Sequence, residues 1–246
     1  MNIFQDTGRY CILMEHVFIK PDRWKMFFRQ FRNELDKLGL QSLPIVLIIS
    51  VFIGAVLTIQ TKLNSENPLL PSYTTGLVTR DTLLLEFSST IMCLILAGKV
   101  GSNIASEIGT MRITEQIDAL EIMGVNSANY LILPKIVAFV LMIPFLTIFS
   151  MAIGLLGGYL VGIFSGIITV AEYVEGIQYA FNAYYVFYSI VKSLVFAFLI
   201  SSVSAYYGYY AYGGALDVGK ASTTAVVNSS ILILFFNLLI TNVMLK

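Results

Sequence analysis

Five long apolar runs, separated by polar segments, dominate the chain after residue 42. Four of them are close to the ~20 residues that one helical membrane crossing needs. The run at 130–166 is much longer, so it must tilt, bend or continue beyond the membrane, and Pro134 and Pro144 offer bends. An extra turn back inside this run is an alternative. The pattern predicts transmembrane helices at 43–60, 82–100, 130–166, 186–206 and 231–245.

The segment before the first run, residues 1–42, is basic and aromatic, and we separate it from a transmembrane domain at 43–246. Between residues 15 and 39, apolar side chains recur at mostly three- and four-residue intervals, which is typical of an amphipathic helix. Because basic residues accompany them, we expect this helix to lie in the membrane interface with its aromatic side toward the lipid. A helix packed on the protein's own surface is the alternative. The apolar positions are Phe18, Trp24, Phe27, Phe28, Phe31, Leu35 and Leu38.

The stretch 103–124, between the second and third runs, is the longest interior segment that is too charged to sit in lipid. Its apolar residues fall on two offset helical stripes, and the offset at Gly109-Thr110 predicts a short helix, a bend and a second short helix. Thr114 is placed to cap the second helix, and the carboxylate of Glu115 is favourable near the positive N-terminal end of that helix. Gly124 can adopt the left-handed conformation that ends the helix. A charged, amphipathic element held between two spans indicates contact with another protein.

Other polar segments predict connections outside the membrane. We expect loops at 61–81 and 209–230. Thr169 and Glu172 form a capping box that opens a short helix ending near Tyr179.

Glycines recur at every fourth position in the second half of the long apolar run. Such spacing produces a smooth helix face that another helix can approach closely. The approaching helix could belong to the same subunit or to a second copy, and the sequence leaves both open. The residues are Gly154, Gly158, Gly162 and Gly166.

Composition agrees with a membrane location. Of 246 residues, 57% are hydrophobic and 12% are charged, against about 25% charged in soluble domains, so we expect an all-α integral membrane protein. The formal net charge is zero, but seven of the 15 Lys and Arg lie before residue 40. This asymmetry argues against nucleic acid as a partner and for a cytoplasmic N-terminus. Five spans then place 103–124 and 213–222 in the cytoplasm.

Candidate catalytic chemistry is sparse. Residues 214–221 spell most of a phosphate-binding loop, but Ala221 stands where Ser or Thr would hold magnesium. The single histidine, His16, lies in the N-terminal segment, and the sequence has no His/Cys cluster with metal-site spacing. Cys11 and Cys93 are expected to be free thiols. We therefore expect a transport subunit that needs no cofactor of its own and hydrolyses nothing itself.

Glu86 places a carboxylate in the second predicted span, where a charge is costly and often functional. The milder interpretation is that Glu86 sits at the headgroup level or pairs with Arg80. An interior poor in charges suits an apolar or amphipathic cargo better than an ion. Uphill movement of such a cargo would need energy delivered from outside the chain, through the cytoplasmic stretch.

The run 107–124, EIGTMRITEQIDALEIMG, closely resembles the signature of the MlaE permease family. The similarity extends through 97–101 and 133–135 and resumes at 213–227, so it touches most of the chain after residue 80. The departures from the family's pattern are Lys99 and Lys135, where Arg is frequent, and Ser89, where Pro is frequent.

This resemblance implies the membrane subunit of an ABC transporter in the inner membrane of a diderm bacterium. The subunit would be a homodimeric permease with an interfacial helix and five spans. Two ATPase subunits, which bind ATP and Mg, would dock below it, and a ring of Mce-domain proteins would sit above. Whether a small cytoplasmic regulator also binds is left open by the resemblance. The cargo would be lipids, most often phospholipids moved between the inner and outer membranes, which maintains outer-membrane lipid asymmetry.

By the same resemblance, 103–124 would be the coupling helix that a groove on the ATPase receives. Its carboxylates would make polar contacts, while Ile117, Leu120 and Met123 would fill the groove. A merely solvated acidic face is the alternative. Glu86 would lie near the outer mouth of the lipid pathway. The residues expected to couple to the ATPase are Glu107, Gly109, Thr110, Met111, Arg112, Thr114, Glu115, Gln116, Ile117, Asp118, Leu120, Glu121, Met123 and Gly124.

Two other classes of function are alternatives. A secondary carrier or channel acting without an ATPase would show inverted repeats or charges at mid-membrane depth. A membrane-embedded lipid-modifying enzyme would need a catalytic or metal constellation in the spans. The sequence shows neither pattern.

Overall fold

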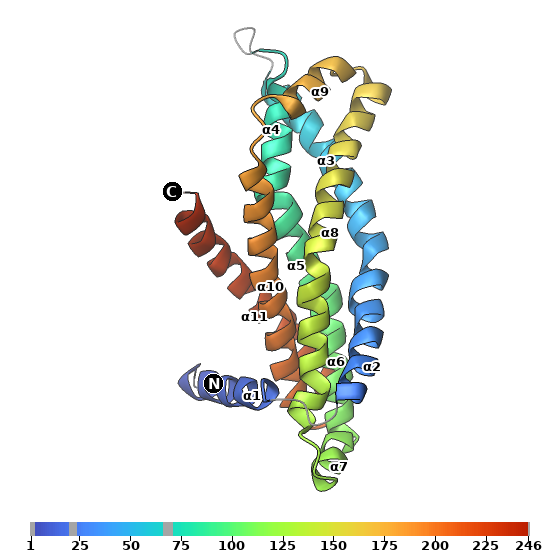
Figure 1. Ribbon diagram of the computed structural model, residues 1–246, viewed down its shortest axis with the longest axis vertical. Helices are drawn as coiled ribbons and strands as arrows, with labels where there is room; N and C mark the ends of the chain where they lie inside the picture. The colour runs from blue at the N-terminus through green and yellow to red at the C-terminus, as the bar shows by residue number, and fades with distance from the viewer. Residues whose placement is uncertain (1–2, 20–23, 66–70, 246) are drawn as a thin grey trace. The chain divides into compact units, whose positions relative to one another are not determined.

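The computed structural model describes residues 3–19, 24–65 and 71–245, and within these ranges it contains helices and no strand (Figure 1). Short π-helical turns at Leu35–Gly39, Leu83–Ile91 and Ala97–Gly101 and a 3₁₀ turn at Leu40–Ser42 link some of the α-helices. The α-helices are α1 (Ile3–Val17), α2 (Trp24–Glu34), α3 (Leu43–Asn64), α4 (Thr74–Thr82), α5 (Met92–Leu96), α6 (Ser102–Ile113), α7 (Gln116–Ile122), α8 (Ser127–Ser165), α9 (Val170–Gln178), α10 (Ala183–Tyr209) and α11 (Ala215–Met244).

Five continuous helical runs among the described residues are long and apolar enough to cross a membrane. The expectation of an all-α integral membrane protein with five spans is therefore confirmed. In a bilayer a helix satisfies its own backbone hydrogen bonds, which is why apolar runs of this length take this form. The runs are Trp24–Asn64, Thr74–Ile113, Ser127–Ser165, Ala183–Tyr209 and Ala215–Met244.

The chain divides into two compact units, which we describe separately. The first unit comprises Met1–Ser42, Leu94–Ile143 and Val195–Leu239. The second unit comprises Leu43–Cys93, Pro144–Leu194 and Ile240–Lys246.

The N-terminal helix predicted at 15–39 is wrong in its bounds. The structure has two helices, α1 and α2, and the predicted residues 20–23 lie outside those it describes. Helix α1 packs within the first unit because Leu13, Met14 and Val17 are buried. Asn129 of α8 donates hydrogen bonds to the carbonyl oxygens of Val17 (2.7 Å) and Ile19 (2.5 Å). These bonds satisfy carbonyl groups at the end of α1, where the helix has no partners of its own.

The two predicted polar loops are also shorter than expected. Helix α3 runs on to Asn64 and α4 begins at Thr74, while α11 begins at Ala215 and covers most of the second predicted loop. The hydroxyl groups do not interrupt α11 because they bond to its own carbonyls; for example, Thr224 donates to Lys220 O at 2.8 Å. A serine or threonine whose hydroxyl donates to a carbonyl of the preceding turn is compatible with a helix. A run of polar residues therefore did not by itself indicate a loop.

Helix α8 is one 39-residue helix without a turn back. Within the second unit, a Cβ placed on Gly54 of α3 would lie 1.8 Å from the carbonyl oxygen of Gly154, so the two backbones approach as only glycine allows. A Cβ on Gly158 would lie 2.1 Å from the Tyr173 hydroxyl oxygen. The glycine face is thus used inside the subunit at these positions. Gly166 lies beyond the helix, with a φ of +64°.

The predicted capping box of α9 is confirmed. The Thr169 hydroxyl accepts from the Glu172 backbone N–H, and the Glu172 carboxylate accepts from the Thr169 N–H, both at 3.3 Å. Burial raises the pKa of Tyr173 in this helix to about 12, so its hydroxyl stays protonated. It donates to the carbonyl oxygen of Leu155 at 3.1 Å, which fixes α9 on α8.

Candidate functional site

The predicted cytoplasmic stretch forms nearly all of α6, a turn, and α7, all in the first unit (Figure 1). The turn lies at Thr114 and Glu115, where Glu115 has a left-handed φ of 60°, so the bend predicted at Gly109-Thr110 is wrong. Gly109 instead allows close packing, because a Cβ there would lie 3.1 Å from Val218 Cγ1 of α11. Thr114 does not cap α7, since its hydroxyl donates back to Thr110 O at 2.8 Å.

An ion pair joins the two short helices across this turn. Arg112 Nη1 lies 2.6 Å from Asp118 Oδ1, and both side chains are partly exposed. The Arg112 guanidinium also lies over the ring of Tyr209, at 5.9 Å from its centroid. Exposed pairs contribute at most about 1 kcal/mol, so this contact orients α7 more than it stabilises the unit.

The end of α7 presents two apolar side chains to solvent. Gly124 has the predicted left-handed conformation, with a φ of +75°. Its N–H donates to Glu121 O at 2.9 Å and the Val125 N–H donates to Leu120 O at 3.0 Å, which together form a Schellman cap. This cap leaves Ile122 87% exposed and Met123 68% exposed.

The apolar residues of this element therefore have different roles. Ile117 is fully buried in the first unit, so in this conformation it cannot fill a partner's groove as predicted. Leu120 is half-buried and Met123 is exposed, as a contact residue must be. Ile122 was missed, although its position just before the glycine cap places it at the tip of the element.

The predicted acidic contacts are largely engaged within the subunit. Glu121 Oε1 accepts hydrogen bonds from the hydroxyls of Ser127 (2.8 Å) and Tyr209 (2.9 Å). Asp118 holds Arg112. Glu115 is exposed and makes no ion pair with any residue that the structure describes. The acids thus form neither a uniform docking face nor a merely solvated one.

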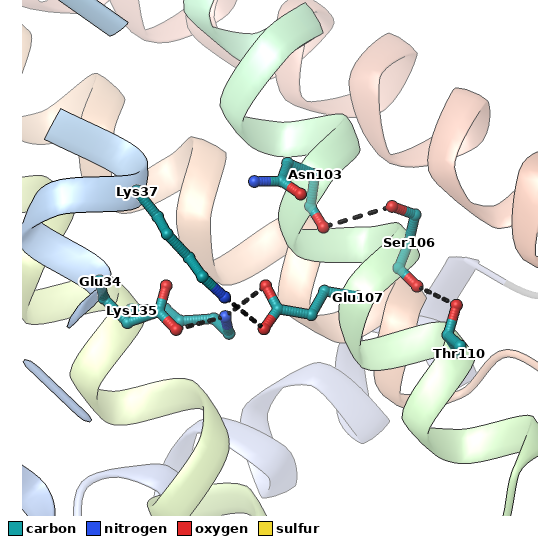
Figure 2. A network of polar contacts seen from close by, with 7 residues as sticks. All are labelled: Glu34, Lys37, Asn103, Ser106, Glu107, Thr110 and Lys135. Atoms are coloured by element: carbon teal, nitrogen blue, oxygen red, sulfur yellow. Dashed lines mark hydrogen bonds and ion pairs between the residues drawn. The ribbon is translucent and has the colours of Figure 1, made fainter. Parts of the chain in front are cut away.

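Glu107 belongs to a network of four charges that converges on Lys135 of α8 (Figure 2). Lys135 Nζ lies 2.8 Å from Glu34 Oε1 and 2.9 Å from Glu107 Oε2. Lys37 Nζ lies 3.3 Å from Glu107 Oε1 on the more exposed side. Lys135 and Glu34 are both buried, which is unusual for charged groups unless they are paired. No local pattern in the sequence predicted these contacts.

Two adjoining surface hollows open beside this network. One has a volume of ≈ 560 Å³ and lies along the segment from Gln30 to Gln41, and the other, of ≈ 530 Å³, lies along α6. Lys37, Gln41 and Glu107 line both. Figure 2 shows the polar side of α6 in this region, which consists of Asn103, Ser106, Glu107 and Thr110.

Glu86 lies in the second unit and has a buried lysine as its partner. Lys192 Nζ is 2.9 Å from Glu86 Oε1, and Thr90 donates to Glu86 Oε2 at 3.1 Å. The side chain of Glu86 is nevertheless 40% exposed. The pairing with Arg80 considered above is wrong, because the Arg80 guanidinium bonds to Asp81 and to two backbone carbonyls at the end of α9, those of Ile177 and Tyr179.

The sequence that resembles a phosphate-binding loop is helical from Ala215 onward. The N–H groups of Asp217 and Val218 donate to the carbonyl oxygen of Gly214, the N–H of Gly214 donates to Asp217 Oδ2, and Lys220 Nζ pairs with Asp217 Oδ1 at 2.9 Å. A phosphate-binding loop needs free N–H groups that converge on the anion, and this segment has a different geometry. Cys11 and Cys93 are free thiols.

Comparison with known proteins adds a family assignment to this geometry. Residues 31–243 match the family model described as Permease MlaE. A probable ABC transporter permease protein of Rickettsia bellii is 37% identical over all of this chain and 95% of its own length, and one of Rickettsia conorii is 40% identical over 98% and 93%. The intermembrane phospholipid transport system permease protein MlaE of Haemophilus influenzae is 28% identical over 99% and 94%.

Proposed function

The chain belongs to the MlaE permease family, and we propose that it is the membrane subunit of an ABC transporter that moves phospholipids between the inner and outer membranes. This activity would maintain the lipid asymmetry of the outer membrane. The names of the Rickettsia and Haemophilus relatives support the transporter class, and the Haemophilus name supports phospholipid as cargo. The location would be the bacterial inner membrane, with the N-terminus in the cytoplasm.

The exposed tip of α7 is the main observation in support of a separate ATPase partner. Ile122 and Met123 are apolar, solvent-exposed and held in place by the glycine cap and the Arg112–Asp118 pair. An apolar tip on a braced element between two spans fits insertion into a groove of a separate ATPase, which would bind ATP and Mg. Glu115 is placed to add a polar contact at the rim.

Two further partners belong to the proposal. A second copy of the chain would pack against α11, whose most apolar window is only 17% buried, against 56% for the corresponding windows of Thr74–Ile113 and Ala183–Tyr209. A Mce-domain protein would receive or deliver the lipid on the side away from the ATPase. Closure of the ATPases would then draw the two coupling elements together and move the spans around a lipid held between the subunits.

Glu86 is the proposed polar group of the lipid pathway. Its carboxylate is anchored by Lys192 but keeps an exposed surface, as a group that meets a lipid headgroup must. Glu86→Ala should slow lipid transfer in reconstituted vesicles while leaving ATPase association intact. Transfer at the normal rate in this variant would remove Glu86 from the pathway.

Copurification tests the proposal directly. The tagged chain should bring down an ATPase and a Mce-domain protein from its native membrane, together with any small cytoplasmic regulator. The double variant Ile122→Asp with Met123→Asp should lose the ATPase and keep the Mce-domain protein. Phe164→Asp is the matched control, since Phe164 is an equally exposed apolar residue at the end of α8. Retention of the ATPase by the α7 variant would contradict the assignment of the docking site.

A further inference from the structure

The charge network at Lys135 connects the coupling element to the segment that leads into the first span. Glu107 lies in α6, about two helical turns before the chain turns into α7. Glu34 ends α2, and from Trp24 the chain stays helical to Asn64. Lys135, in the first third of α8, binds both carboxylates. The two ion pairs that share this ammonium group therefore link α6 to α2.

The two ends of this connection differ in how firmly they are held. Lys135 and Glu34 are both buried and lie 2.8 Å apart, so their separation would leave charges stranded in the protein interior. Glu107 is only partly buried, and its second partner, Lys37, is half-exposed at 3.3 Å. The Lys135–Glu34 pair is thus the fixed end of the connection, and Glu107 is the end that can move.

Stability alone does not require such a network. A buried ion pair adds little or nothing over well-packed apolar side chains of similar volume, whereas it fixes direction and partner strictly. In addition, Glu34 Oε2 is buried without a hydrogen-bond partner among the described residues, so the network is not arranged for maximum stability. These features fit a joint between helices better than a static brace.

We propose that Lys135 is a positioning residue which, acting through Glu107 and Glu34, transmits the movement of α6 and α7 to the α2 segment. This inference rests on the proposed function, because the movement would come from the ATPase. Loss of the connection should separate ATP hydrolysis from lipid transfer without preventing ATPase docking, since the tip of α7 is not altered.

Charge exchange tests the connection while keeping the buried pair. The double variant Glu34→Lys with Lys135→Glu retains opposite charges between α2 and α8 but places the new carboxylate at position 135 against Glu107. Adding Glu107→Lys restores attraction at that contact, and the half-exposed Lys37 can turn away from the new lysine into solvent. The matched control is Asp217→Lys with Lys220→Asp, which exchanges an exposed pair of the same unit.

Each variant is assembled with its ATPase and Mce-domain partner in vesicles, and ATP hydrolysis and fluorescent phospholipid transfer are measured together. We expect the lipid transferred per ATP to fall about tenfold in the double variant and to return to within about threefold in the triple variant. The control should match the wild type. A normal ratio in the double variant, or an equally low ratio in the triple variant, would overturn the inference.

Single variants cover the case in which the exchanged protein does not assemble. Glu107→Gln leaves the Lys135–Glu34 pair intact and should lower the ratio, whereas Lys135→Arg keeps the charge and should preserve it. A normal ratio in Glu107→Gln would equally overturn the inference. A wild-type complex that neither hydrolyses ATP nor transfers lipid would instead refute the proposed function.

Discussion

The two units of this chain hold their helices together by different means. In the first unit, charges from α2, α6 and α8 converge on Lys135. In the second unit, α3 and α8 approach at the bare backbones of Gly54 and Gly154, and the buried Lys192 holds Glu86. An ion pair has a direction and can exchange partners, whereas glycine packing depends on close fit over a surface. The first unit is therefore suited to transmit a displacement, and the second to stay rigid.

Removing Lys135 should cause the largest effect. Lys135→Met would leave Glu34 as a buried carboxylate without a compensating charge, and we expect the free energy of unfolding to fall by ~3–5 kcal/mol. Thermal unfolding of the purified protein in detergent measures this loss. The double variant Lys135→Met with Glu34→Gln, which leaves no buried charge at the pair, should recover most of it. No recovery would mean that packing around Lys135, and not charge, supports the first unit.

Adding one methyl group to the glycine contact tests the second unit. Gly54→Ala places a Cβ against the backbone of Gly154, which cannot move aside as a side chain can, and we expect a loss of ~1–3 kcal/mol. Gly98→Ala is the control, because no atom lies within 4 Å of a Cβ at that position. The same unfolding measurement should find the control as stable as the wild type or more stable. Equal behaviour of the two variants would contradict close glycine packing.

Loss of the Lys192–Glu86 pair of the second unit should lower stability less than loss of Lys135 from the network of the first unit. Lys192→Met leaves the Glu86 carboxylate without its lysine, but this side chain is 40% exposed, so we expect a loss of only ~1–3 kcal/mol. Adding Glu86→Gln to this variant should restore about half of the loss, again by thermal unfolding. If Lys192→Met proved as destabilising as Lys135→Met, the contrast between the units would fail.

The ion pair between α6 and α7 should show the smallest effect on stability. Arg112→Met removes a partly exposed pair, and the expected change is below about 1 kcal/mol. The orientation of α7 should nevertheless change, so the affinity for the ATPase should fall more than stability does. Binding titrations at low and high salt check this. Added salt screens the ion pair, so it should lower the affinity of the wild type for the ATPase toward that of the variant. A large loss of stability would show that the pair braces the whole unit.

Local patterns in the sequence predicted the spans and several helix ends correctly. Apolar runs identified all five crossings, Gly124 marked the end of α7, and Thr169 and Glu172 marked the start of α9. The pattern failed where polar residues bond within a helix, as in the first half of α11, which it assigned to a loop. It also placed the turn of the stretch 103–124 too early, because Gly109 marks a close helix contact and not a bend.

The sequence by itself determined the class of the protein, its five membrane crossings and the position of the charged stretch 103–124 between two of them. These features depend on residues close together in the chain, and on the fact that a helix in lipid must form its backbone hydrogen bonds internally. Only the tertiary structure decided that Ile117 is buried, that Ile122 is exposed at the tip, and that Glu34 and Glu107 meet at Lys135. The reason is physical, since the members of this network lie up to 101 positions apart and their contact depends on how the helices cross.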